Sequence, residues 1–496
     1  MNQTKNNNNS SYFQFIILWI VIIVAGQSKS LLFVPILIGV IIIWYNKFVN
    51  DPVWAFMFAL TIFYNIGNYL TKKSFGLFNV FQVRDLFLIL AFLAGTHVYL
   101  KKLPRVWSSN IGKNIVVLLM LFTFYQIFIS AFLLHEQSVK SLVKEIVAQR
   151  WRFFGVFIIF PAYKIFLYDP KLVVNIIVRF TIFILGIYFF SLFSGINLID
   201  ISISERFSGT GMIRKGIRNY GFMQNTIIFM VVVIWLRKFE GKRMFLVAGI
   251  GMLITTLLTL TRYTNFTTFT SIIISVIMIS FLGYKLKVGH LYTKLIGVII
   301  VMITIMVLFF PNLITNLYET YYFTWLEITG EVAKGTTQSR SEIEYVNVMP
   351  VIEKNPFFGV GFTDYMLGRE EGGDDFGFSD IPLFANIAIY GFFGLALYYS
   401  VYFLVLKLIF QFLKTVRRYG IYYFNSYSML LFITYSVSII NTIIFKTFNI
   451  SSDLSLRSGR IYHGIMLAII LSSVTKYQFE LTKELNRKSK NNMFNV

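Results

Sequence analysis

The residues in this sequence that are best suited to chemistry are arginines placed beside small residues or at the ends of apolar runs. Arg206 precedes Phe-Ser-Gly-Thr-Gly, Arg218 precedes Asn-Tyr-Gly-Phe-Met-Gln-Asn, and Arg262 stands in Thr-Leu-Thr-Arg-Tyr-Thr between two apolar runs. A guanidinium offers a planar fork that binds phosphate oxygens in a bidentate manner, and it keeps its charge when partly buried. These arginines are therefore candidate ligands for a phosphate-bearing substrate. For each of them, pairing with a nearby carboxylate or reaching to lipid headgroups is an equally good explanation.

The most informative stretch begins at Arg340. From residue 341 to residue 353 apolar residues recur every third position, which predicts a short amphipathic helix. We expect Pro350 to kink or end this helix. Next comes Asn355-Pro-Phe-Phe-Gly-Val-Gly361, whose proline and glycines predict a turn. A further apolar segment then begins at Asp380-Ile-Pro and contains Gly391-Phe-Phe-Gly394.

Together these segments resemble the O-antigen polymerase and ligase superfamily of bacterial membrane glycosyltransferases. That family typically shows an Arg opening a loop helix, an Asn-Pro turn ending in Gly-Val-Gly, and a following span ending in Gly-x-x-Gly. The resemblance extends upstream through Arg218-x-x-Gly221 and Leu260-Thr-Arg262, and covers about residues 205–398. Ligase-type members carry His where this chain has Asp380, and this departure favours a polymerase.

The resemblance implies an inverting, metal-independent glycosyltransferase of the GT-C class, without a cofactor. Its donor would be a glycan on polyprenyl diphosphate, and its acceptor a hydroxyl of another lipid-linked glycan. The physical argument agrees, because the leaving diphosphate gains charge in the transition state and fixed cations stabilise that charge. We expect the diphosphate to be bound by four arginines: Arg206, Arg218, Arg262 and Arg340.

The acceptor hydroxyl also requires a base, and Asp380 is the first candidate. The structural alternative, at least as good, is that Asp380 caps the following helix while Pro382 occupies its first turn. Glu342 and Glu344 are the fallback bases, and both also suit a solvated helix surface. The adjacent carboxylates of residues 374 and 375 follow two glycines, which is more typical of a solvated loop tip than of a cation site. We therefore predict no metal.

The composition indicates what must position these residues. The 496-residue chain is 56% hydrophobic and only 14% charged, so it cannot be a conventional soluble protein. Apolar runs long enough to cross the roughly 30 Å hydrocarbon core of a bilayer recur along the chain, and such segments must be helical. We expect an all-α polytopic membrane protein with about 14 transmembrane helices. They begin near residues 12, 31, 53, 83, 113, 153, 172, 220, 243, 265, 293, 381, 421 and 460.

Lysines and arginines at the ends of membrane helices are retained on the cytoplasmic side. Lys-rich connections, for example 237–243 and 414–418, then lie inside together with both termini. This orientation divides the chain into helices 1–11 over residues 1–310, a large extracytoplasmic loop with short helices over 311–382, and helices 12–14 with a cytoplasmic tail over 383–496. The net charge of +22 marks this orientation and contact with anionic lipid, and it does not indicate nucleic acid as a partner.

The sequence thus predicts a polymerase of O-antigen, capsule or exopolysaccharide in a bacterial plasma membrane, with its active site facing outside. Its partners would be polyprenyl-diphosphate-linked oligosaccharides, membrane lipids and a chain-length regulator. A ligase is the second prediction. A flippase or other transporter is the third, although transporters tend to show two related halves and this chain has one large asymmetric loop.

Overall fold

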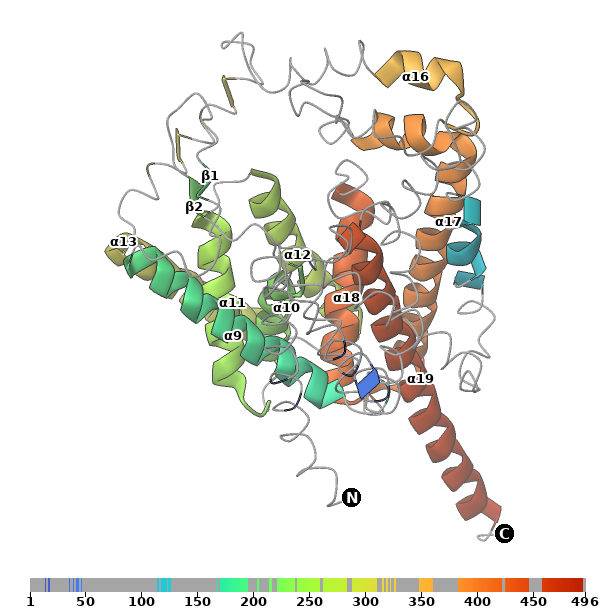
Figure 1. The fold of residues 1–496 in the computed structure, drawn as a ribbon. Helices are drawn as coiled ribbons and strands as arrows, with labels where there is room; N and C mark the ends of the chain where they lie inside the picture. Colours follow the sequence, from blue (N-terminus) through green and yellow to red (C-terminus); the bar gives the residue numbers. More distant parts are fainter. Residues whose placement is uncertain are drawn as a thin grey trace.

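The computed structural model describes residues 170–194, 203–204, 214–215, 221–236, 239–258, 262–282, 288–309, 348–359, 382–421, 424–445 and 457–493, most of 114–125, and some isolated positions. Within these residues nearly every element is a helix (Figure 1). The long ones are α9 (Pro170–Ser194), α10 (Gly221–Trp235), α11 (Lys242–Leu258), α12 (Arg262–Phe281), α13 (Val288–Phe309), α17 (Pro382–Tyr419), α18 (Ser426–Phe445) and α19 (Arg457–Met493). The short elements are α16 (Met349–Lys354) and two strands that pair antiparallel, β1 (Ile203–Ser204) and β2 (Arg214–Lys215).

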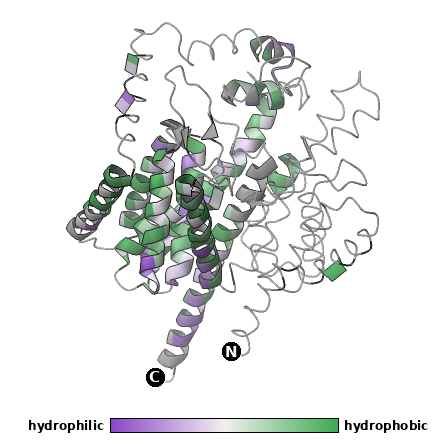
Figure 2. Ribbon diagram, turned by 60° about the vertical axis from the view of Figure 1, so that its left-hand side comes forward, coloured by the Kyte–Doolittle hydropathy of each residue, from purple (hydrophilic) through white to green (hydrophobic). Residues whose placement is uncertain are grey.

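Three described helices are long and apolar enough to cross a membrane: 170–194, 386–419 and 426–444. Shorter apolar helices cover 223–235, 265–281 and 296–309. Figure 2 shows hydrophobic residues over the helix bundle and hydrophilic residues over the end of α19 that extends beyond it. The predominantly helical, membrane-type fold is therefore confirmed for the part of the chain that the structure describes.

The core lies where α10, α11, α12 and α18 pack against one another and α9 packs against three of them. Residues 225–234 of α10 are all buried, and α18 is buried without a break from residue 428 to 439. Helices that are buried around their whole circumference have protein on all sides. By contrast, α9 and α13 expose large apolar side chains such as Phe183, Phe190, Ile299 and Ile300. Those faces suit hydrocarbon, which is what the sequence predicts for their surroundings.

Most described helices begin within three residues of the predicted starts, including α9, α10, α11, α12, α17 and α19. Two begin five residues away: α13 starts earlier, at Val288, and α18 later, at Ser426. The late start of α18 has a local cause, because the side chain of Asn425 accepts a hydrogen bond from Tyr427 N at 2.9 Å and so caps the helix.

The loop helix differs from the prediction at Pro350. Within the described residues, α16 starts at Met349, holds Pro350 in its first turn and continues to Lys354, so the expectation that Pro350 ends the helix is wrong, and the alternative of a kink at Pro350 stays a prediction. A proline is tolerated there because the first turn of a helix leaves its N–H groups without intrahelical partners. The predicted helical residues 341–347 lie outside the described residues.

The first segment of α17, residues 382–390, is set off from the rest by a break at Gly391, where φ is +62° and ψ is 178°. Figure 1 shows the segment before the break turned across the top of the bundle and the segment after it running down the bundle. The positive φ explains why glycine occupies this position, since residues with a Cβ rarely adopt it. Beside the lower segment lies the helical stretch 114–125, which follows the predicted start near residue 113.

Candidate functional site

Four of the predicted site residues lie outside the described residues: Arg206, Arg218, Arg340 and Asp380. Each is nevertheless bounded by described elements. Arg206 falls between β1 and β2, and Arg218 lies three residues before α10. Asp380 lies two residues before α17, and Arg340 lies nine residues before α16. Arg262 is the first residue of α12. The fallback bases Glu342 and Glu344 are also outside the described residues.

Hydrogen bonds between helices place the starts of α10 and α12 at the same end of the bundle. Gln224 Nε2, in the first turn of α10, donates to Thr268 Oγ1 of α12 at 2.9 Å. Ser438 Oγ, near the end of α18, donates to Asn225 Oδ1 at 2.8 Å. The residues that follow Arg218 and those that follow Arg262 are therefore neighbours. Two helix N-termini in one place offer unpaired backbone N–H groups and positive dipole ends to an anion.

These bonds belong to a larger interhelical polar cluster in the part of the bundle described. Asn441 of α18 donates through Nδ2 to Thr267 O at 3.0 Å and to the hydroxyl of Ser271. Thr270 Oγ1 donates to Asn441 Oδ1 at 3.3 Å. We define the interhelical polar cluster as Gln224, Asn225, Thr267, Thr268, Thr270, Ser271, Ser438 and Asn441. It joins α10, α12 and α18 just below their common end, where an apolar core would otherwise be expected.

Two buried oxygens beside this cluster lack a hydrogen-bond partner within the described structure. Asn265 is 1% exposed and its Oδ1 has no partner, and Thr434 Oγ1 is likewise buried without one. Unsatisfied polar groups in a buried environment are costly, and for that reason they are uncommon. Asn265 lies one helical turn from Arg262, so polar character extends from the cluster toward the start of α12.

The second feature at this end is a docked turn, residues Asn355–Gly359, that sits on the break in α17. Phe392 N donates to Pro356 O at 2.9 Å, and Phe393 N donates to Phe357 O at 3.0 Å. Gly359, at φ +72°, closes the turn through a 2.9 Å bond from its own N to Asn355 O. The approach is so close that a Cβ on Gly359 would lie 2.4 Å from Ile389 O, and one on Gly391 would lie 2.2 Å from Phe357 O.

The structure therefore brings residues 355–359 of the first glycine motif onto residues 391–393 of the second. The turn contacts α17 at residues 392 and 393, where the segment after the break begins. The following helix, α18, begins near the opposite end of α17 and reaches the interhelical polar cluster at Ser438. The docked turn and the starts of α10 and α12 thus share one end of the bundle, the upper end in Figure 1.

Tyr125 holds the docked turn from a third direction. Its hydroxyl lies 2.8 Å from Phe358 O and 2.7 Å from Tyr390 O, so its single proton is shared between two carbonyl acceptors. Nothing in the sequence singled out Tyr125, because its contacts join residues more than two hundred positions apart. The interhelical polar cluster was missed for the same reason, although Gln224 and Asn225 stood in the quoted motif after Arg218.

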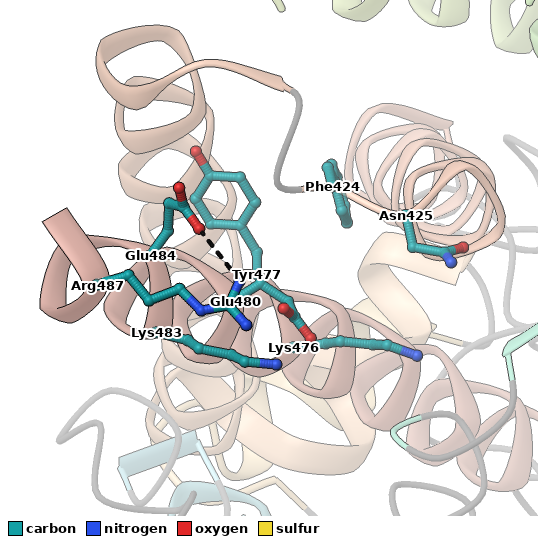
Figure 3. A pocket seen from close by; sticks show the side chains of 8 residues that line it. All are labelled: Phe424, Asn425, Lys476, Tyr477, Glu480, Lys483, Glu484 and Arg487. Atoms are coloured by element: carbon teal, nitrogen blue, oxygen red, sulfur yellow. Dashed lines mark ion pairs between the residues drawn. The ribbon is translucent and has the colours of Figure 1, made fainter. Parts of the chain in front are cut away.

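The opposite end of the bundle contains a cavity with a volume of about 300 Å³ (Figure 3). It lies between α19 and the connection from α17 to α18. Its lining mixes cations and carboxylates: Lys476, Lys483 and Arg487 with Glu480 and Glu484, beside Phe424, Asn425 and Tyr477. Glu484 lies 3.9 Å from Arg487. Because the charges of both signs alternate along one side of α19, this cavity does not have the character expected of a diphosphate site.

Lysines gather at this same end. Lys171 pairs with Glu240 at 2.5 Å, and Lys242 at the start of α11 approaches Ile234 O at 3.5 Å. Burial, and secondly the nearby charge of Lys294, lower the pKa of Lys242 below its ordinary value of 10.5. Within the described residues no group of three or more histidines, aspartates or glutamates is placed to hold a metal ion.

The comparisons with known proteins return no matching family model and no matching curated protein.

Proposed function

We propose that the protein is a polysaccharide polymerase of the O-antigen polymerase and ligase superfamily. It would act in a bacterial plasma membrane through about 14 transmembrane helices arranged as in GT-C enzymes. The reaction would transfer a growing glycan from polyprenyl diphosphate to the hydroxyl of a lipid-linked repeat unit, with inversion and without a metal. O-antigen, capsule and exopolysaccharide are the product classes that fit.

The observation that carries the proposal is the docking of Asn355–Gly359 on the break at Gly391. These residues belong to two motifs that carry the family resemblance and that are separate in the sequence. In the structure they meet through paired backbone hydrogen bonds. The contact joins the turn after α16, 15 residues beyond Arg340 in the sequence, to the break in α17, 11 residues beyond Asp380. This contact lies at the end of the bundle where α12 begins with Arg262. Proximity of this kind is what a site needs in order to act on both a diphosphate and a hydroxyl.

In this proposal Arg206, Arg218, Arg262 and Arg340 bind the donor diphosphate and stabilise the charge that grows on it as the glycosidic bond breaks. Asp380 accepts the proton of the acceptor hydroxyl as that oxygen attacks the anomeric carbon. The polyprenyl chains of both substrates remain in the bilayer. The position of the lysines at the opposite end of the bundle supports an outward-facing site, since lysine-rich ends stay in the cytoplasm.

The test is a cell-free reaction with purified full-length protein in lipid nanodiscs and a polyprenyl-diphosphate-linked repeat unit. A polymerase converts the unit into a ladder of lengths without any other protein. A single product of fixed length, formed only when a second glycan or lipid acceptor is added, would instead indicate a ligase. Movement of the lipid-linked unit across vesicles without a new glycosidic bond would indicate a transporter and overturn the proposal.

Arg340→Lys sharpens the same test. Lysine keeps the positive charge but loses the bidentate fork, so we expect the ladder to be lost almost as completely as with Arg340→Ala. Full activity of both variants at normal protein abundance would remove Arg340 from the site.

A further inference from the structure

Tyr125 is the one described side chain whose hydroxyl bridges the docked turn and the break in α17. Tyr125 belongs to none of the sequence motifs. It lies in the stretch 114–125, more than two hundred residues before Phe358 and Tyr390 in the sequence. That stretch has a buried helical stripe of Ile115, Leu119, Phe122 and Tyr125. Phe122 contacts the ring of Tyr390 at 5.3 Å between centroids and that of Tyr398 at 5.8 Å. Tyr125 is therefore fixed by a rigid surface, and it is only 8% exposed.

The ring of Tyr125 fits where α17 has no side chain. A Cβ on Gly394 would come 2.5 Å from Cε1 of Tyr125, so glycine at 394 makes room for the ring. The ring also contacts Phe393 at 5.4 Å between centroids. The position of the hydroxyl follows from these ring contacts. It can reach Phe358 O and Tyr390 O only while the turn remains docked on the break.

We propose that Tyr125 is a positioning residue that holds the segment leading from Arg340 in register with the segment leading from Asp380. This inference rests on the function proposed above, because those two residues are the proposed diphosphate ligand and base. The hydroxyl joins Phe358, which follows α16, to Tyr390, which ends the first segment of α17. Tyr125 itself touches no reacting atom. It acts by limiting how far the two loop segments move apart during transfer.

Tyr125→Phe is the informative variant, because it removes the hydroxyl and leaves the ring against Gly394 and Phe393. The backbone bonds from Phe392 N and Phe393 N to the turn can still form, so the turn docks for most of the time and the protein keeps its fold. Small displacements of catalytic groups strongly reduce rate, and we expect kcat to fall by about tenfold while KM for the lipid-linked donor changes less than about threefold.

Tyr477→Phe is the matched control. The Tyr477 hydroxyl also donates to a backbone carbonyl at a helix end, Gly420 O at 2.8 Å, but at the opposite end of the bundle. The ring of Tyr477 is fully buried. Removing this hydroxyl imposes a similar structural loss without touching the docked turn. We expect kcat for Tyr477→Phe to stay within about twofold of the parent chain if turn placement is what matters.

A readout that does not require activity separates this inference from the proposed function. The chain has no cysteine, so Phe357→Cys and Phe392→Cys, both at exposed positions on the docked turn and the break, can carry a pair of nitroxide labels alone. With Tyr125 present, we expect strong dipolar broadening at ambient temperature. With Tyr125→Phe added, we expect the broadening to weaken as the two segments separate part of the time.

Rescue completes the design. Cross-linking the same two cysteines with a short bifunctional thiol reagent should restore kcat to the Tyr125→Phe chain and leave KM unchanged. Unchanged broadening in Tyr125→Phe, or equal kcat losses in Tyr125→Phe and Tyr477→Phe, would overturn the inference. If Tyr125→Phe weakens the broadening but the parent chain forms no glycan under any condition, the polymerase proposal is rejected and the Tyr125 clamp remains as a structural contact.

Discussion

At one end of the bundle the docked turn meets α17 through backbone atoms and two glycines, whereas at the other end the helix connections meet through charged side chains. The first contact has no spare room, since a Cβ on Gly391 would overlap the carbonyl of Phe357. The second is open: the side chains of Lys171 and Glu240 are 49% and 75% exposed although they form an ion pair. Exposed pairs of this kind contribute little, while a backbone contact tolerates almost no change. The backbone geometry is therefore tightly constrained at the end with the docked turn, whereas the opposite end is characterised by its charged side chains.

This difference is what a membrane transferase with an outward-facing site would require. Two large lipid-linked substrates must meet with their reacting atoms in register, and a rigid backbone contact can provide that register. In the proposed orientation the lysine-rich end would face the cytoplasm and would have only to hold the protein in that orientation, which lysines achieve without defined geometry.

The largest effect is expected from Asp380→Asn. A general base must take up a proton, and removal of one costs roughly 10² to 10⁴ in rate, so turnover should be nearly lost while donor binding remains. A helix cap has only to accept a hydrogen bond, which asparagine does as well as aspartate. Ladder formation and donor binding are measured side by side.

The opposite end supplies the control for this exchange. Asn425 caps α18 by accepting a bond from Tyr427 N, so Asn425→Asp should leave turnover unchanged. A ladder of normal yield from Asp380→Asn would reject Asp380 as the base and direct attention to Glu342 and Glu344, or to a donor phosphate that takes the proton.

The next largest effect compares two glycines that both have a positive φ, one at each end. Gly391 has φ +62° and Gly241, between α10 and α11, has φ +73°. Alanine at either position carries strain of about 1–3 kcal/mol. At Gly241 nothing lies within 4 Å of the new Cβ, whereas at Gly391 the Cβ would meet backbone 2.2 Å away.

We therefore expect Gly391→Ala to lower the melting temperature in nanodiscs more than Gly241→Ala, and to abolish transfer by undocking the turn. Gly241→Ala should retain most activity. Equal losses in melting temperature and activity would mean that the docked turn is no more constrained than an ordinary helix connection.

The interhelical polar cluster allows a smaller, structural prediction. Asn441→Ala removes the bonds to Thr267 and Ser271, and hydrogen bonds between membrane helices average about 0.6 kcal/mol with a maximum near 1.7. A loss of about 1–2 kcal/mol in unfolding free energy is expected. The matched control is Thr415→Ala, which removes only an exposed bond to Gln411 O within α17. If both variants unfold alike, the cluster does not hold α12 to α18.

The helices were predictable from the sequence because their signal is local. An apolar run such as 172–194 is long enough to identify a helix by itself, and the starts of α9 and α11 were placed to within two residues. The start of α18 was missed because it depends on one capping side chain, Asn425, that interrupts an otherwise apolar run. Pro350 was misread for a related reason, since a proline inside an apolar pattern fits both the end and the start of a helix.

For the candidate site, the sequence predicted which segments take part but not how these segments contact one another. The glycines at 359 and 391 could be recognised as turn residues, but no local pattern indicates that one docks on the other. Tyr125 carries no signal at all, because a tyrosine at the end of an apolar run is ordinary in a membrane protein. The four arginines and Asp380 were chosen by type and resemblance, and their roles remain predictions.

The smallest expected effect concerns the pKa of Lys242 at the charged end. Burial is the larger cause of its lowering and the charge of Lys294 the smaller, so Lys294→Gln should raise the pKa of Lys242 only part of the way toward 10.5. Lys294→Arg keeps the charge and should leave that pKa unchanged. Competitive amine labelling across alkaline pH, followed by mass spectrometry of the peptide that contains Lys242, measures this pKa.

Because the folded state disfavours the protonated lysine, the contribution of Lys242 to the unfolding free energy is unfavourable at neutral pH. That contribution improves as pH rises from the lowered pKa toward 10.5, and Lys294→Gln should narrow this pH window. A full return to 10.5 in Lys294→Gln would show that charge alone, and not burial at the start of α11, sets the pKa, and that the charged end is more open than its structure indicates.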